Sequence, residues 1–227
     1  FRFTKNFFFL SAGFFVTHLA GLGVLLYATR KLTIGGFGVL SFAVSLINVL
    51  QNIVLLGTSG VAIRDVAKDR QILSQYIGNI TTIKVFTSFI AFGILAVFSW
   101  TSGIFCPTCI KFWTVVIYAL VFFVFIIDFQ WVFISLEKME WNFVISLVLS
   151  LSYVSLAVLF VAFSPSPIGV VSANVIGQFL ASLTGIYLIK RLFSGVKFNF
   201  NFQNIGVIVK SGIILALIAF LANCLIE

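Results

Sequence analysis

The chain has 227 residues, of which 61% are hydrophobic and only 9% are charged, and its mean hydropathy is +1.20. A water-soluble domain carries about 25% charged residues, so this chain has too few to cover a solvent-facing surface. The composition therefore excludes a soluble globular protein and predicts an integral membrane protein.

Seven long apolar runs, separated by short connectors, account for most of the chain. A helix needs about 20 residues to cross the hydrocarbon core of a bilayer, and each run reaches that length. We expect helices because lipid offers the backbone no hydrogen-bond partners, and the sequence lacks the alternating segments of about 10 residues that a transmembrane β-barrel needs. The predicted spans are Phe7–Thr29, Phe37–Ile63, Tyr76–Trp100, Phe112–Leu136, Trp141–Phe163, Ile168–Ile189 and Ile205–Ile226.

Lysine and arginine are distributed unevenly over the predicted connectors. If the N-terminus is cytoplasmic, ten of the 14 lie on the cytoplasmic side, three lie outside, and Lys84 lies within a span. Cytoplasmic connectors are enriched in these residues, so the sequence predicts this orientation and accounts for the net charge of +8 without a nucleic-acid partner. The ten are Arg2, Lys5, Arg64, Lys68, Arg70, Lys138, Lys190, Arg191, Lys197 and Lys210, and the three are Arg30, Lys31 and Lys111.

Two cysteines form a Cys106-Pro-Thr-Cys109 pair in the predicted outer loop between the third and fourth spans. The sequence has no second pair of this kind and no histidine nearby. An incidental loop pair or a local disulfide is therefore favoured over a metal or redox site.

Small residues recur at four-residue intervals in the first and sixth predicted spans. Such residues let the backbones of membrane helices approach closely. We therefore expect both stripes to be packing surfaces. They consist of Gly13, Thr17 and Gly21 in the first span, and of Ala173, Gly177, Ala181 and Gly185 in the sixth.

Short motifs surround the second span and mark the end of the fourth. Arg30-Lys-Leu32 precedes a glycine-rich turn, Gly35-Gly-Phe-Gly38, and the uncharged run after it ends at Arg64-Asp65. Asp128-Phe-Gln-Trp131 and Leu136-Glu-Lys-Met139 come later. In these motifs the chain resembles the polysaccharide (O-antigen-type) flippase family, whose superfamily also holds the MATE exporters and the lipid II flippases.

The resemblance implies an all-α polytopic membrane fold in which this chain is the N-terminal half of a two-lobe, MATE-like transporter. Residues 1–189 would form a six-helix lobe, residues 190–204 a cytoplasmic linker, and residues 205–227 the first helix of a second lobe. Because the sequence begins at Phe1 rather than at methionine and stops after an apolar run, we expect it to be part of a longer protein.

The same resemblance implies a function. The protein would carry an oligosaccharide linked to a polyprenyl diphosphate across the inner (cytoplasmic) membrane by alternating access, in support of surface polysaccharide or lipopolysaccharide synthesis. Its partners would be this lipid-linked oligosaccharide, membrane lipids and H⁺ or Na⁺ as a coupling ion.

Polar side chains within the spans are candidates for the substrate path, since they are costly in lipid. At a rise of 1.5 Å per residue, His18 and Gln51 lie about 17 and 18 Å from the cytoplasmic ends of their spans, and Gln178 about 15 Å from the outer end. Asn48, Asn52 and Asn174 lie nearby. This polar belt indicates either a hydrated cavity or hydrogen bonds between packed helices.

Four charged residues are the other candidates. Lys84 and Asp128 should lie about 12 Å deep on neighbouring antiparallel helices, where they could form an ion pair that either fixes packing or exchanges partners during transport. Arg30 and Arg64 end their spans on opposite sides of the membrane. Each is either a simple end signal or a contact for a diphosphate, which a guanidinium can bind through two hydrogen bonds.

The sequence contains no catalytic triad, no phosphate-binding loop and no metal-ligand cluster, so we expect neither an enzyme nor a bound metal or cofactor. Two other functions fit the composition. A MATE-like exporter of small organic cations, driven by H⁺ or Na⁺, should have acidic cavity residues, and Asp128 is the only acid within a predicted span. A membrane subunit without transport activity should pack its polar belt tightly.

Overall fold

The computed structural model of the protein describes residues 2–101, 109–192, 206 and 208–212, and every regular element in them is helical. Six helices are long and apolar enough to cross a membrane, which confirms the first six predicted spans. The predicted seventh span, the linker and Cys106 lie wholly or mostly outside the described residues. The six are Thr4–Lys31, Ile34–Lys68, Arg70–Ser99, Ile110–Ser135, Met139–Phe163 and Pro167–Leu192.

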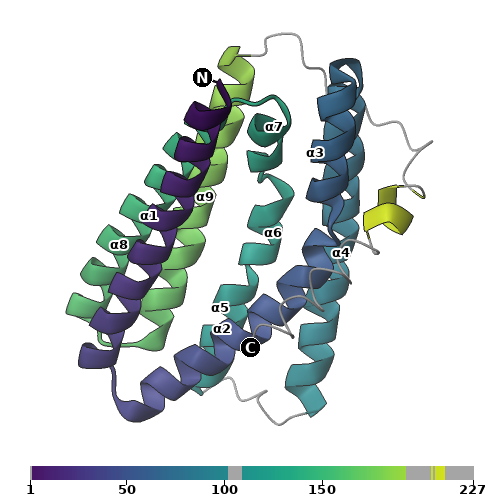
Figure 1. The fold of residues 1–227 in the computed structure, drawn as a ribbon. Coiled ribbons are helices and arrows are strands. Elements are labelled where there is room, and N and C mark those ends of the chain that lie inside the picture. The colour runs from purple at the N-terminus through teal and green to yellow at the C-terminus, as the bar shows by residue number, and fades with distance from the viewer. Residues whose placement is uncertain (1, 102–108, 193–205, 207, 213–227) are drawn as a thin grey trace, which may run out of the picture.

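The helices run alternately up and down and form two groups joined through the middle (Figure 1). One group contains α1 (Arg2–Lys31), α8 (Met139–Phe163) and α9 (Pro167–Leu192). The other contains α3 (Thr58–Lys68) and α4 (Leu73–Thr101), which the short 3-10 helix η1 (Arg70–Ile72) precedes. Between them run α2 (Ile34–Leu55), α5 (Ile110–Ala119), α6 (Val121–Ile126) and α7 (Gln130–Ser135).

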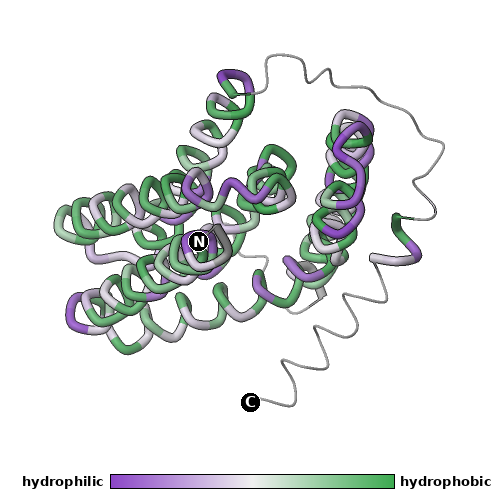
Figure 2. The backbone as a smooth tube through the Cα atoms, turned by 45° about the horizontal axis from the view of Figure 1, so that its top comes forward, coloured by the Kyte–Doolittle hydropathy of each residue, from purple (hydrophilic) through white to green (hydrophobic). Residues whose placement is uncertain are grey.

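Successive spans run in opposite directions, so every second connector lies on the same side of the bundle. The predicted distribution of lysine and arginine requires this arrangement. Lys5 near the start of α1 forms a 2.6 Å ion pair with Glu140 in the first turn of α8. At the opposite side α1 turns sharply into α2, where the Thr33 hydroxyl accepts a hydrogen bond from the backbone N–H of Gly36 at 3.1 Å. Figure 2 shows hydrophobic residues along most of the tube, with hydrophilic stretches in α3 and at several helix ends.

The second span, predicted as one helix, is interrupted between α2 and α3. Leu56 and Gly57 have φ angles of 42° and 61°, in the left-handed region that glycine tolerates and leucine seldom adopts. The next residue, Thr58, donates its hydroxyl hydrogen to the Leu55 carbonyl at 2.9 Å. Gly212 lies against this interruption, since a Cβ atom there would come 2.5 Å from the Leu56 carbonyl oxygen.

The fourth span is also interrupted, where a continuous helix from Phe112 to Leu136 was predicted. α6 ends at Ile126 and α7 begins at Gln130. Between them, Oδ1 of Asp128 accepts a hydrogen bond from the backbone N–H of Gln130 at 3.2 Å. An aspartate that binds nearby backbone in this way competes with the regular helical bonds, which gives the physical reason for the break.

Small residues bring the helices of the first group together, as predicted for part of each stripe. A Cβ atom on Gly177 of α9 would lie 3.2 Å from the Tyr153 backbone nitrogen of α8. One on Gly13 of α1 would lie 3.3 Å from the Ser146 hydroxyl oxygen of α8. A Cβ atom on Gly21, by contrast, would meet no described atom within 4 Å, so this glycine borders open space.

Candidate functional site

One face of α2 carries exposed polar side chains over about three helical turns. Ser41, Ser45, Asn48 and Asn52 recur at intervals of three and four residues, and all four are exposed. The intervening residues Leu40, Ala43, Ile47, Leu50 and Val54 are buried against the other helices. Because polar groups in direct contact with lipid tails are costly, this face indicates a water-containing space next to α2.

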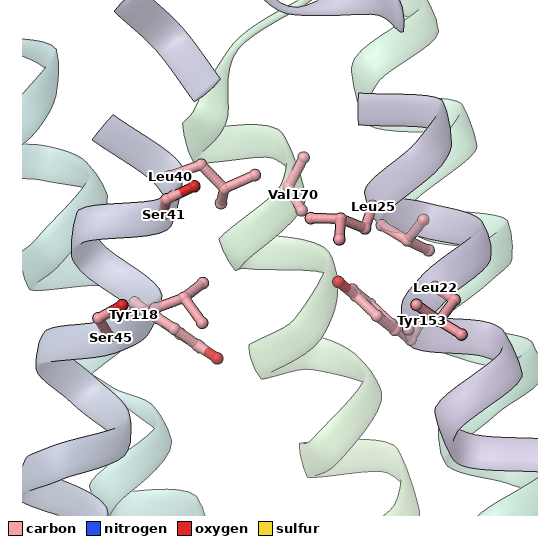
Figure 3. Close-up of a pocket in the computed structure, with 11 residues that line it drawn as sticks. Leu22, Leu25, Leu40, Ser41, Ser45, Tyr118, Tyr153 and Val170 are labelled. Carbon is pink, nitrogen blue, oxygen red and sulfur yellow. The ribbon is translucent and has the colours of Figure 1, made fainter. Parts of the chain in front are cut away.

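The first part of this polar face, at Ser41 and Ser45, borders a cavity of about 390 Å³, here called the tyrosine cavity. Figure 3 shows Tyr118 of α5 and Tyr153 of α8 reaching into it from opposite sides, with their hydroxyl groups toward the middle. Two phenol hydroxyls and two serines give the cavity hydrogen-bonding groups without a charge. The full lining is Gly21, Leu22, Val24, Leu25, Leu40, Ser41, Val44, Ser45, Tyr118, Tyr153 and Val170.

A second cavity, here called the asparagine cavity, lies farther along α1 toward the N-terminal side. It has a volume of about 310 Å³ and is enclosed by α1, α7 and α8. Asn142, only 6% exposed, contributes a buried side-chain oxygen that has no hydrogen-bond partner among the described residues. The full lining is Leu10, Gly13, Phe14, Thr17, His18, Gln130, Ile134, Asn142, Ser146 and Leu149.

His18 is the one predicted site residue that lines either of these two cavities. Its ring stacks on Phe14 with the centroids 5.6 Å apart, and its Nδ1 lies 2.8 Å from the Phe14 carbonyl oxygen. A carbonyl can only accept, so this contact assigns the proton to Nδ1 and leaves Nε2 without that bond.

The other predicted site residues of the first two spans lie far apart along the bundle. Gln51 is half-buried in α2, and Arg30 is exposed at the far end of α1. Arg64 lies near the opposite end of the bundle, where its Nε donates to Asp65 Oδ1 at 2.8 Å. The second oxygen of Asp65 accepts a hydrogen bond from the Tyr76 hydroxyl at 2.9 Å. The structure therefore does not bring the two arginines together.

Lys84 and Asp128 do meet, as their predicted depths required, but not as the ion pair that was expected. The Lys84 ammonium is only 1% exposed and donates to the backbone carbonyl of Asp128 at 2.9 Å. The Asp128 carboxylate is instead occupied with the backbone of Gln130. The physical reason is the break in the fourth span, which leaves the backbone carbonyl of Asp128 free to accept from Lys84 of α4.

Several residues of the site were not predicted from the sequence. Ser41 and Ser45 were missed although they continue the face of Asn48 and Asn52, which belong to the expected polar belt; residues three and four apart lie on one helix face. Tyr118 and Asn142 gave no such signal, because their place in a cavity depends on how the helices pack.

The chain matches the protein family described as "Polysaccharide biosynthesis protein" over residues 3–225. Comparison with curated proteins and with solved structures gives no significant match.

Proposed function

Because the chain belongs to the polysaccharide biosynthesis protein family and spans the membrane several times, we propose that it is a flippase for a lipid-linked oligosaccharide. In this proposal the protein moves a glycan joined to a polyprenyl diphosphate across the cytoplasmic membrane, for use in surface polysaccharide synthesis. The glycan crosses through the polar space beside α2, and the polyprenyl tail stays in the surrounding lipid.

The exposed polar face of α2 is the observation that carries this proposal. Its serines and asparagines, together with the tyrosine and asparagine cavities, offer neutral donors and acceptors that suit the hydroxyl groups of sugars. Among the described residues, neither cavity lining includes a lysine, an arginine or an acid. The arginines at the two ends of the lobe suit the diphosphate, which guanidinium groups can bind through two hydrogen bonds.

The proposed mechanism is alternating access. The polar face of this lobe would meet a second lobe across a central space, which opens first to one side of the membrane and then to the other. The neutral lining would let the glycan slide past without a strongly bound intermediate, since each hydroxyl exchanges one neutral partner for another.

The test uses the full-length protein in vesicles that contain a polyprenyl-diphosphate-linked oligosaccharide with a fluorescent label. Transfer is measured as the fraction of glycan that becomes accessible to an added glycosidase. We expect transfer above the level of protein-free vesicles, and a clear loss with Asn48→Leu, which removes a polar group from the exposed face. Val49→Leu is the matched control, because Val49 is 58% exposed on the same helix but is already apolar.

Transfer no faster than in protein-free vesicles would refute the flippase proposal. Uptake of an organic cation dye in place of the glycan would favour the exporter alternative. Equal activity of Asn48→Leu and Val49→Leu, with transfer intact, would remove the α2 face from the path.

A further inference from the structure

Three side chains on one face of α4 bind backbone carbonyls of both interrupted spans. The Thr87 hydroxyl lies 2.9 Å from the Val54 carbonyl at the end of α2, which is its shortest contact, and 3.0 Å from the Ile83 carbonyl of its own helix. Ser88 Oγ donates to the Phe122 carbonyl in α6, also at 2.9 Å. The Lys84 ammonium donates to the Asp128 carbonyl between α6 and α7, as described above. These three residues, here called the α4 clamp, therefore join three segments that are far apart in the sequence.

The α4 clamp answers a specific physical need. The Val54 and Asp128 carbonyls lie at the two interruptions, and a carbonyl that loses its helical partner inside a membrane must find another donor or bear a large desolvation cost. The Phe122 carbonyl lies within α6, where Ser88 adds a contact between the two helices. Two other hydroxyls of α4, those of Thr81 and Thr82, bind the carbonyls of Ile77 and Gly78 one turn earlier in their own helix.

The apolar core divides at the level of the clamp. On the side of the N-terminus, α3 and α7 pack together with the first turns of α4, and we call this group the proximal unit. On the other side, α2, α5 and α6 pack with the later part of α4, and we call this group the distal unit. The proximal core includes Ala62, Val66, Ile77, Ile80, Trp131 and Val132, which pack on Ile145 of α8 and on Ala181, Leu188 and Ile189 of α9. The distal core includes Ile47, Val54, Ala91, Leu95, Phe122 and Phe125.

Only α4 runs unbroken through both units among the second, third and fourth spans (Figure 1). The two interruptions and the clamp lie between the units, so two of these three spans have no continuous helix there. α3 and α7 share one core, so a movement of one is transmitted to the other, and both would move against the unbroken helices α8 and α9.

We propose that Lys84, Thr87 and Ser88 are positioning residues that hold two hinges closed, and that α3 and α7 swing as one body about this level. This motion is one part of the alternating-access cycle, and its link to transport rests on the proposed function. The three clamp residues line neither the tyrosine cavity nor the asparagine cavity, so they act on the substrate path only through the helices they position.

The test is hydrogen–deuterium exchange, followed by mass spectrometry, on the full-length protein in lipid nanodiscs. Lys84→Met removes the ammonium but keeps an unbranched side chain of similar length. A hydrogen bond from a charged group shifts an opening equilibrium by about tenfold or more. We therefore expect exchange of α7 amides to rise about tenfold, and exchange in α3 to rise with it although Lys84 donates to no carbonyl of α3.

Thr87→Val and Ser88→Ala extend the test to variants that remove one neutral hydrogen bond and so disturb folding less. Thr87→Val should also raise exchange in α3 and α7 together, and Thr87→Ser, which keeps the hydroxyl, should restore the wild-type pattern. Thr82→Val is the matched control on the same helix and should leave exchange in both units unchanged.

Exchange that rises in α7 alone would overturn the proposal, because α3 and α7 would then not move together. Exchange that rises equally in the proximal and distal units would also overturn it, because it would show a general loss of stability. Unchanged exchange in all three clamp variants would overturn it as well. The readout needs no transported substrate, so its failure is distinguishable from failure of the flippase proposal.

Discussion

The Lys84 ammonium and the Asp128 backbone carbonyl lie 2.9 Å apart in the interior of the bundle. Lysine in a membrane usually pairs with an acid, and Asp128 is the only acid within a predicted span. Here the acid supplies its carbonyl, while its carboxylate holds the start of α7 through the backbone of Gln130. One residue thus performs two tasks at the break in the fourth span.

The separate roles of the Asp128 carbonyl and carboxylate predict how substitutions at Lys84 and Asp128 change the stability of the protein. Asp128→Asn keeps both the carbonyl and a side-chain acceptor for Gln130, so we expect the smallest loss of stability. Asp128→Ala loses the bond to Gln130, about 1 kcal/mol, and Lys84→Ala leaves a buried carbonyl without a donor, about 1–3 kcal/mol. Thermal unfolding of the purified full-length protein should rank them in this order. If Asp128→Asn is as damaging as Lys84→Ala, the carboxylate is the true partner of the ammonium.

The orientation of the lobe can be tested with single cysteines in a cysteine-free background. Lys68→Cys and Lys111→Cys place exposed thiols at opposite ends of the bundle. The excess of lysine and arginine beside the N-terminus predicts that a membrane-impermeant maleimide labels the cysteine at position 111 in intact cells. The one at position 68 should react only after the cells are permeabilised, and the reverse pattern would invert the topology.

Close packing of α8 on α9 predicts a large difference between two glycines. Gly177→Leu forces a side chain against the Tyr153 backbone, 3.2 Å from the Cβ position, whereas Gly93→Leu enters open space. Overpacking of this kind costs about 1–3 kcal/mol. We expect a lower melting temperature and lower membrane abundance for the first variant and little change for the second. Similar behaviour of both would contradict the helix packing described here.

The unpaired oxygen of Asn142 predicts opposite effects on stability and on transport. Asn142→Leu removes a buried acceptor that has no partner among the described residues, which should stabilise the protein by about 1–3 kcal/mol. If a sugar hydroxyl uses this oxygen, transfer of the lipid-linked glycan should fall at the same time. Unfolding and vesicle transfer are measured on the same preparation, and a gain in both would show that the asparagine cavity is not part of the path.

Diphosphate contacts at the ends of the lobe can be examined through Arg30 and Arg64. Each is replaced with alanine in the full-length protein, and surface polysaccharide and protein abundance are measured together. We expect less polysaccharide at unchanged abundance, because both side chains are exposed and neither holds the core. Lys31→Ala serves as a control for the loss of one positive charge beside Arg30. Normal polysaccharide in both arginine variants would remove them from the substrate path.

The membrane helices could be predicted from sequence because their signal is local: a long uncharged run in lipid has few alternatives to a helix. The depths of Lys84 and Asp128 followed from the same regularity. The interruptions could not be predicted, since Leu55-Leu-Gly57 is as apolar as its surroundings and contains no proline. What stabilises each break is a donor on α4, and the Val54 carbonyl lies 33 residues from Thr87 in the chain. A contact at such a separation depends on tertiary packing, as do the tyrosine and asparagine cavities.

The α4 clamp also constrains how the protein is made. Spans leave the ribosome in chain order, so the Val54 carbonyl has no donor until Thr87 has been synthesised. Lys84 likewise has no acceptor until Asp128 follows, 44 residues later. A lone lysine at the middle of a membrane helix costs about 2.5–3.5 kcal/mol during insertion. We therefore expect the second and third spans to stay beside the insertion machinery until the fourth arrives, and nascent chains that stall before it to be marked for degradation.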